Sequence, residues 1–260
     1  MKALLTGAGG TIGTRLGEAL ARQGVDVVRW PRERVPVDDY WAMERFVRSV
    51  APDVLFHLAT ASRPTGRDNE SWLVNYEWTS ELAWICRQVG VRFVFTSTAL
   101  VFSDLAPGPF TVDSVPEAPH GYGYEKRRAE ARVFEQNPEA RVVRLGWQID
   151  EHPAGNTMLA SLEAQARERG WVEASTRWFP ACAFLDDTVR ALQALAWTEP
   201  GLYLLDANER WSFHDIVRAL NARRGHPWRV EPTEHFVFDQ RMLDDRVVLP
   251  SLQKRLPALT

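Results

Sequence analysis

The chain has 260 residues, of which 45% are hydrophobic and 25% charged, and its formal net charge is −3. This composition is typical of a globular protein and concentrates no positive potential that would bind nucleic acid or an anionic membrane. No stretch reaches the ~20 apolar residues that a membrane span needs. Two cysteines, Cys86 and Cys182, are too few for a disulfide framework, and the chain starts almost directly on a glycine-rich turn. We therefore expect no signal peptide and a cytoplasmic location.

Apolar and helical patterns alternate along the first 150 residues. An apolar run over 3–6, helical spacing over 12–23 and a β-rich run over 25–30 predict a strand, a helix and a second strand. The further predicted elements are a helix over 40–50, a strand over 52–59, a helix over 72–89, a strand over 91–96, a helix over 122–135 and a strand over 141–145. Because strands that alternate with helices form parallel sheets covered on both faces, the pattern predicts an α/β fold.

The pattern is looser after residue 150. Helices are predicted over 158–169, 187–197 and 212–223, the last with Ser212 as its N-cap, and a strand is predicted over 202–205. The sequence contains no internal repeat, low-complexity tract or flexible linker. We therefore expect residues 1–150 to form an α/β core and residues 151–260 a small lobe packed on it.

A glycine-rich turn joins the first predicted strand to the first predicted helix. Glycine lets the backbone turn tightly and approach a pyrophosphate, whose charge is then stabilised by N–H groups at the positive end of the helix. The alternative is a tight turn without a ligand, but the position of this turn in a strand–helix–strand unit favours a dinucleotide. The residues expected to bind it here are Gly7, Gly9, Gly10, Thr11, Ile12 and Gly13.

The end of the second predicted strand bears on the choice of cofactor. An NAD site usually offers a carboxylate to the adenosine ribose at this point, whereas this chain offers Arg29 and Arg32. A planar guanidinium can pair with two oxygens of a 2′-phosphate. The arginines therefore favour NADP over NAD, the alternative being a cluster of solvated charges.

Three residues further along the chain predict acid–base chemistry. Thr98 ends the strand predicted after residue 90, and Tyr122 and Lys126 open the helix that follows. Positions i and i+4 lie on one face of a helix, so the phenol and the amine can face the same site, whereas Tyr124 points elsewhere. A nearby ammonium lowers the pKa of a phenol from about 10, which makes it a usable proton donor or acceptor.

In this combination the sequence resembles the extended short-chain dehydrogenase/reductases, and among them the dTDP-4-dehydrorhamnose reductase-like group. The matching pieces are the segments 6–13, 52–59, 97–102 and 122–126, with Asn75 and Arg144. They fall in family order over residues 1–150, and a weaker likeness continues through 184–187. The resemblance implies a Rossmann fold with a doubly wound parallel sheet and a small C-terminal substrate-binding lobe.

The resemblance also implies roles for individual residues. Tyr122 would be the catalytic acid/base, Lys126 would hold the nicotinamide ribose and tune Tyr122, and Thr98 would orient the reacting oxygen. The backbone at Leu58, Ala59 and Thr60 would line the cofactor, and Asn75 would lie near the nicotinamide unless it is a packing residue. We interpret His57, within an apolar strand, as a hydrogen-bonded core histidine.

Departures from the family patterns narrow the reaction. Ala99 and Leu100 stand where the related sugar-nucleotide dehydratases carry an acidic pair, and the GDP-fucose synthase type has a cysteine in place of Ala99. We therefore expect an NADP-preferring oxidoreductase that reduces a ketone, the 4-keto group of a nucleotide-activated deoxysugar. The alternatives are an NAD-dependent sugar-nucleotide 4-epimerase and a non-catalytic NAD(P)-binding regulatory protein.

The second half offers weaker signals. The loop 148–156 is the expected substrate rim, and Asn156 with Thr157 is either a phosphate contact or, as we favour, a helix cap. Arg177 and Arg241 are candidate anion contacts or plain surface arginines. Cys182, among apolar neighbours, is expected to be a buried thiol, and no cluster has the spacing of a metal site.

Three of the 11 tryptophans, Trp72, Trp78 and Trp84, recur at six-residue intervals in one predicted helix. Six residues advance a helix by ~240° beyond a full turn, so the three indoles do not share a face. Such a helix needs cover on more than one side, and in the family this region often forms the subunit interface. We therefore expect a homodimer.

Overall fold

The computed structural model describes residues 1–62, 65–152 and 155–259, which form two compact units. Unit 1 comprises Met1–Val101, Pro116–Arg144 and Val189–Tyr203; unit 2 comprises Phe102–Val115, Leu145–Thr188 and Leu204–Thr260. The expected division has a single boundary after residue 150. The chain instead returns to unit 1 after residue 188, because the last strand of the main sheet lies there.

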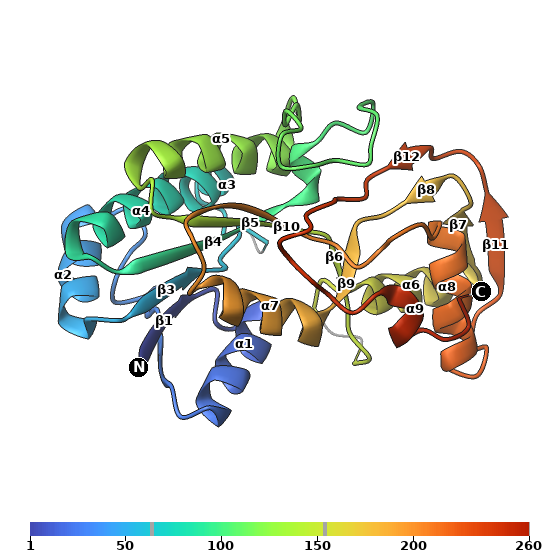
Figure 1. The fold of residues 1–260 in the computed structure, drawn as a ribbon, viewed down its shortest axis with the longest axis horizontal. Coiled ribbons are helices and arrows are strands. Elements are labelled where there is room, and N and C mark those ends of the chain that lie inside the picture. Colours follow the sequence, from blue (N-terminus) through green and yellow to red (C-terminus); the bar gives the residue numbers. More distant parts are fainter. Residues whose placement is uncertain (63–64, 153–154, 260) are drawn as a thin grey trace. The chain divides into compact units, whose positions relative to one another are not determined.

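Unit 1 is built on a central parallel sheet of six strands, in the order β10-β5-β4-β3-β1-β2 (Figure 1). The strands are β1 (Lys2–Thr6), β2 (Asp26–Arg29), β3 (Val54–His57), β4 (Arg92–Thr98), β5 (Arg141–Leu145) and β10 (Gly201–Leu205). β1 pairs in parallel with β2 on one side and with β3 on the other. The predicted α/β class and doubly wound parallel sheet are confirmed.

Helices cover both faces of this sheet. They are α1 (Thr11–Arg22), α2 (Tyr40–Val50), α3 (Glu70–Trp72), the π-helix η1 (Leu73–Glu77), α4 (Trp78–Val89), the 3₁₀ turn η2 (Ala99–Val101), α5 (Gly121–Gln136) and α7 (Leu185–Leu195). α2, α4 and α5 lie on one face, and α1 and α7 on the other (Figure 1). Leu55 packs into the core under α2, α4 and α5, while its neighbours Val54 and Phe56 face the opposite layer. This explains why β3 is apolar at successive positions.

The helix predicted over 72–89 is interrupted. Its first part is a π-helix at η1, and α4 begins only at Trp78. One extra residue in a turn does not change the apolar pattern enough to be seen in the sequence. The cover that we expected from a second subunit comes instead from α2 and α5, which both pack against α4. The three tryptophans therefore give less support to a homodimer than expected.

Unit 2 contains short parallel pairs and three helices. β6 (Trp147–Ile149) pairs with β9 (Cys182–Phe184), β7 (Val172–Ser175) with β11 (Val230–Thr233), and β8 (Trp178–Phe179) with β12 (Phe238–Asp239). The helices are α6 (Met158–Arg169), α8 (Phe213–Arg223) and α9 (Leu252–Arg255). Ser212 caps α8 as predicted, in a reciprocal capping box with Asp215. None of the described helices is long and apolar enough to cross a membrane.

Candidate functional site

The glycine turn after β1 can be formed only without side chains at two positions. Gly7 has φ +63°, in the left-handed region that favours glycine. A Cβ on Gly13 would lie 2.1 Å from the carbonyl oxygen of Gly7, inside van der Waals contact with backbone. A Cβ on Gly9 would instead meet nothing within 4 Å. The turn is therefore closely packed on its inner side and open at Gly9, which is the shape that a bound pyrophosphate requires.

The turn lies at the point where the chain changes direction across the sheet. After β1 it continues to β2 on one side, and then crosses to β3 on the other; ligands of such sheets bind at this switch point. A Cβ on Gly7 would be 2.8 Å from the backbone nitrogen of Ala59. The Thr6 hydroxyl accepts the N–H of Leu58 at 3.1 Å. Gly7, Leu58 and Ala59, predicted from separate motifs, are thus brought into contact.

The two arginines expected to select NADP lie at the end of β2 and just after it. Arg29 is the last residue of β2 and is exposed. The Arg32 guanidinium donates to the Glu70 carboxylate at 3.2 Å, and Glu70 also accepts the N–H of Thr65 at 2.6 Å. Glu70 was not predicted, because nothing in the spacing of residues 32 and 70 indicates that they meet. Glu70 is 6% exposed, so it holds Arg32 from a fixed position.

Thr98 and the first turn of α5 are joined by a close backbone contact. Thr98 is the last residue of β4, and its hydroxyl accepts the N–H of Leu100 at 3.2 Å. A Cβ on Gly123 would lie 2.0 Å from the carbonyl oxygen of Leu100. Gly123 therefore lets α5 pack directly on η2, the turn that follows Thr98. This packing places Tyr122, next to Gly123, at the same end of β4 as Thr98.

Lys126 is fully buried, and its Nζ has no hydrogen-bond partner among the described residues. The Nζ lies 4.2 Å from the centre of the Phe95 ring and 5.9 Å from that of Tyr122. Burial lowers the pKa of Lys126 to about 7, against the charges of Glu130 and Glu125, which raise it. A buried amine without a partner is costly unless a ligand satisfies it. The ribose hydroxyls of a dinucleotide fit this requirement, so the residues present suit the predicted cofactor.

The net shift of the Tyr122 pKa is upward, and not downward as a nearby ammonium alone would make it. The pKa of Tyr122 is raised above its ordinary value, because burial of its hydroxyl disfavours the phenolate and the Glu125 carboxylate repels it. Glu125 was not among the groups expected to act on Tyr122. The phenol is therefore held in its protonated form, although the residue as a whole is 37% exposed.

Asn75 has hydrogen-bond partners within the protein. Its Oδ1 accepts the N–H of Ala61 at 3.2 Å, and its Nδ2 donates to the Glu125 carboxylate at 2.7 Å. Asn75 is 1% exposed. It thus lies beside the loop after β3, and its amide is engaged by α5 and by that loop.

His57 is a hydrogen-bonded core histidine, as predicted. The Thr6 hydroxyl, which accepts the N–H of Leu58, is left to donate to Nδ1 of His57 at 2.9 Å. Nε2 then carries the proton and donates to the Thr79 hydroxyl at 2.9 Å. Burial, together with the charge of Lys126, holds the pKa of His57 well below its usual range. The ring is therefore neutral.

The candidates in unit 2 have mostly structural contacts. Thr157 caps α6 by accepting the N–H of Ala160, Cys182 is a buried thiol whose pKa is raised by burial, and Arg241 is paired with Asp239 at 2.6 Å. Arg177 is exposed. Positions 153–154 of the expected rim 148–156 lie outside the described residues. Among those described, no group of His, Cys, Asp and Glu could hold a metal ion.

An aromatic cluster lies beside β6 in unit 2. The Trp178 ring centre is 4.6 Å from that of Phe213 and 6.2 Å from that of Trp147. Two buried polar atoms of unit 2, Nε1 of Trp178 in this cluster and Oε1 of Gln148 in β6, have no hydrogen-bond partner among the described residues. Unit 2 therefore also carries polar groups that a ligand could satisfy.

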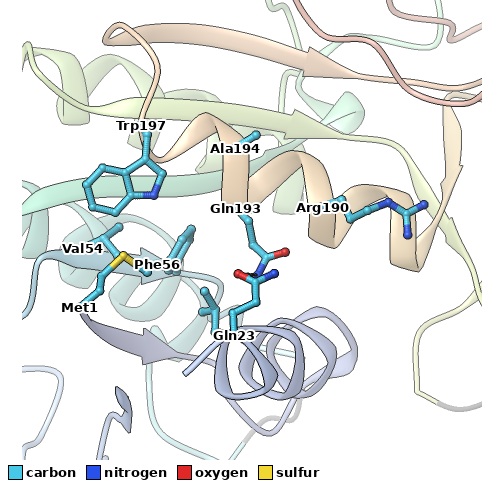
Figure 2. A pocket seen from close by; sticks show the side chains of 9 residues that line it. Met1, Gln23, Val54, Phe56, Arg190, Gln193, Ala194 and Trp197 are labelled. Atoms are coloured by element: carbon cyan, nitrogen blue, oxygen red, sulfur yellow. Dashed lines mark hydrogen bonds between the residues drawn. The ribbon is translucent and has the colours of Figure 1, made fainter. Parts of the chain in front are cut away.

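A cavity of about 370 Å³ lies on the α1 and α7 face of unit 1, away from these residues (Figure 2). It is lined by Met1, Leu20, Gln23, Val54, Phe56, Arg190, Gln193, Ala194 and Trp197. Gln193 donates to the side chain of Gln23 at 3.3 Å. Met1 directly precedes β1 and Val54 begins β3, whereas the glycine turn follows the end of β1. The cavity is therefore not part of the candidate site.

The sheet order, with a glycine turn at its switch point, is that of the α/β fold of the extended short-chain dehydrogenase/reductases. Residues 1–240 match the family model described as the RmlD substrate binding domain. The chain belongs to this family.

Individual relatives agree with this assignment. The chain is 30% identical over 200 residues to dTDP-4-dehydrorhamnose reductase of Mycobacterium tuberculosis, covering 74% of this chain and 65% of that protein. It is 27% identical over 246 residues to the reductase of the same name from Burkholderia thailandensis, covering 89% and 80%. The chain thus spans just under two thirds of the mycobacterial relative.

A solved structure confirms the fold. The dTDP-4-dehydrorhamnose reductase of Bacillus anthracis, described in complex with NADP, has a TM-score of 0.83 to this chain at 18% identity, covering 99% of this chain and 96% of that one. At this identity the likeness is one of fold.

Proposed function

We propose that the protein is an NADP-dependent reductase of the keto group of a nucleotide-activated sugar, the 4-keto group of a deoxysugar being the substrate we favour. The names of its relatives and the NADP bound to the related Bacillus protein support this. The observation that carries it is the fully buried Nζ of Lys126, without a partner among the described residues, one helical turn from Tyr122. A panel of keto-sugar nucleotides tested for NADPH oxidation, with simple ketones beside them, examines the proposal directly.

The residues of the chain supply acid–base chemistry and positioning. The nicotinamide supplies the hydride when it is bound. Tyr122 donates a proton to the carbonyl oxygen, and the raised pKa of its phenol keeps that proton available across neutral pH. Thr98, at the end of β4, orients the same oxygen. Lys126 binds the ribose, and Gly7 with its turn holds the pyrophosphate.

Arg32 is expected to discriminate between the two nicotinamide cofactors. Replacing Arg32 with alanine should raise the Kd for NADPH by about 10-fold or more and leave that for NADH within about twofold, because only NADPH carries the 2′-phosphate. Fluorescence titration of both cofactors measures this, and Arg132→Ala, an exposed arginine of α5, is the control. Equal losses for both cofactors would contradict the assignment; Arg29→Ala tests the second arginine in the same way.

We propose unit 2 as the substrate-binding lobe, in place of the single segment 151–260 expected from the sequence. The aromatic cluster around Trp178 and the buried Oε1 of Gln148 support this, because aromatic faces and buried polar atoms together suit a nucleotide sugar.

We further propose a homodimer in the cytoplasm. The rings of Trp72, Tyr76 and Tyr124 stack in a half-buried aromatic row, with centres 4.2 and 6.3 Å from that of Trp72, and such rows favour protein interfaces. The two thiols, Cys86 and Cys182, are free and buried, as suits a reducing compartment. Light scattering at micromolar concentration is expected to give twice the chain mass of 29.6 kDa, and a monomeric mass would refute the dimer.

A further inference from the structure

The carboxylate of Glu125 stands between the helix that carries Tyr122 and the segment that precedes α4. Its Oε2 accepts hydrogen bonds from Oγ of Ser71 and from Nδ2 of Asn75, both at 2.7 Å. The second hydrogen of Nδ2 donates to Oγ of Ser71 at 3.2 Å. The three side chains therefore form a closed triangle of hydrogen bonds.

The triangle continues to the loop after β3. Oδ1 of Asn75 accepts the N–H of Ala61 at 3.2 Å, and Ala61 directly follows the residues 58–60 proposed to line the cofactor. One connected series of hydrogen bonds thus runs from the first turn of α5, through Asn75, to the cofactor loop. Because Asn75 is buried, breaking this series would leave its amide unsatisfied at a cost in free energy.

The series passes through the π-helix η1, in which Asn75 is the middle residue. The Thr79 hydroxyl donates to the carbonyl oxygen of Asn75 at 3.0 Å and holds the widened turn. A π turn is rare and occurs mostly at functional sites. The local helix geometry therefore independently marks the place where Glu125 binds.

We propose that Glu125 is a positioning residue for the reaction: through Ser71 and Asn75, its carboxylate keeps the turn bearing Tyr122 and Lys126 in register with the cofactor loop. The inference rests on the proposed function and deepens it. A displacement of about 1 Å in a reacting group can cost 10²-fold in rate. The hydrogen bonds of Glu125 therefore affect the rate if they hold α5 in place to within this distance.

The charge of Glu125 acts on the same two residues. It raises the pKa of Tyr122, which keeps the phenol protonated, and that of Lys126, where it opposes burial. Lys126 also faces Glu130 of α5, which is paired with Arg144 of β5, and the neutral His57 of β3. Removing the charge of Glu125 while keeping a hydrogen-bond acceptor should therefore shift both titrations to lower pH.

Steady-state kinetics separate the effect of the Glu125 hydrogen bonds from the effect of its charge. Glu125→Ala breaks the triangle and is expected to lower kcat by about 10-fold or more, with the KM for NADPH within about threefold. Glu125→Gln keeps an acceptor oxygen, so most of kcat should return. The high-pH limb of its kcat profile, which reports the coupled Tyr122 and Lys126 groups, should lie about half a pH unit or more below that of the wild type. Glu135→Gln, exposed on the same helix, is the control. Wild-type kcat and pH profile in both Glu125 variants would overturn the proposal.

A second measurement needs no substrate. The chain has only three lysines, Lys2, Lys126 and Lys254, so the titration of Lys126 can be followed by NMR with ¹³C-labelled lysine. Its midpoint is expected to fall in Glu125→Gln while those of Lys2 and Lys254 stay unchanged; an unchanged Lys126 midpoint would refute the electrostatic part. Failure of the proposed function would give a different result. The wild-type protein would then oxidise no NADPH with any keto-sugar nucleotide, while the Lys126 midpoint would still fall in Glu125→Gln.

Discussion

Replacing Tyr122 with phenylalanine is expected to lower kcat by about 10²–10⁴-fold, the usual contribution of a positioned general acid. The substitution removes only the hydroxyl and keeps the ring, which packs at the start of α5. Thr98 and Lys126 remain in place, but neither can donate the proton from the position of the phenol. The Kd for NADPH should stay within about threefold, because the glycine turn and the arginines proposed to bind the cofactor are on other elements.

Tyr124→Phe is the matched control for this prediction. Tyr124 lies on the same helical turn, but its ring centre is 6.3 Å from that of Trp72 and 5.3 Å from Cζ of Arg127. Its loss of a hydroxyl should leave kcat within about twofold of the wild-type value. Near-normal rates in Tyr122→Phe, or equal losses in both variants, would show that the proton comes from another group.

Replacing Gly13 with alanine is expected to disrupt the cofactor site and to destabilise the fold. The new Cβ would lie 2.1 Å from the Gly7 oxygen and 2.8 Å from the Ala8 Cα. Both are backbone atoms, so α1 must move away from the turn rather than a side chain rotating aside. Such overpacking costs about 1–3 kcal/mol. A lower Tm and a rise of about 10-fold or more in the Kd for NADPH are expected.

Two further glycine variants separate binding from folding. Gly9→Ala adds a methyl group where nothing lies within 4 Å, so its Tm should match the wild type, while the methyl group obstructs the pyrophosphate and raises the Kd for NADPH by about 10-fold. Gly17→Ala, inside α1 and 3.7 Å from the Leu5 side chain, should leave the Kd unchanged and gain up to about 1 kcal/mol of stability. Unchanged NADPH affinity in Gly9→Ala would show that the turn does not cradle the cofactor.

The elements of unit 1 were predicted well because their signals are local. The helix predicted over 40–50 is α2 within its observed bounds, and the strand predicted over 141–145 is β5. Each has an apolar pattern whose period depends only on its own backbone geometry. The glycine turn was also readable, since a strand, a tight turn and a helix follow one another without a break.

Contacts between residues far apart in the sequence could not be predicted in the same way. Glu125 was not predicted to act at the site, although it is next to Lys126, raises the pKa of Tyr122 and binds Asn75.

The composition did contain an indication of the importance of Lys126: the chain has 31 basic residues but only three lysines. A buried lysine can titrate near neutral pH and an arginine cannot, so a lysine at 126 in an arginine-rich chain indicates a site that uses that chemistry.

By itself the sequence determined the α/β class, the order of the strands and main helices along unit 1, and which residues carry the glycine turn and the Tyr–Lys pair. These follow from periodicity and from residue types at short spacing. The sequence did not predict the short strands of unit 2. The tertiary structure alone decided that residues 189–203 return to unit 1, that Glu70 holds Arg32, and that Tyr122 stays protonated. The physical reason is that burial and charge depend on which segments pack together, and packing joins residues that no local pattern relates.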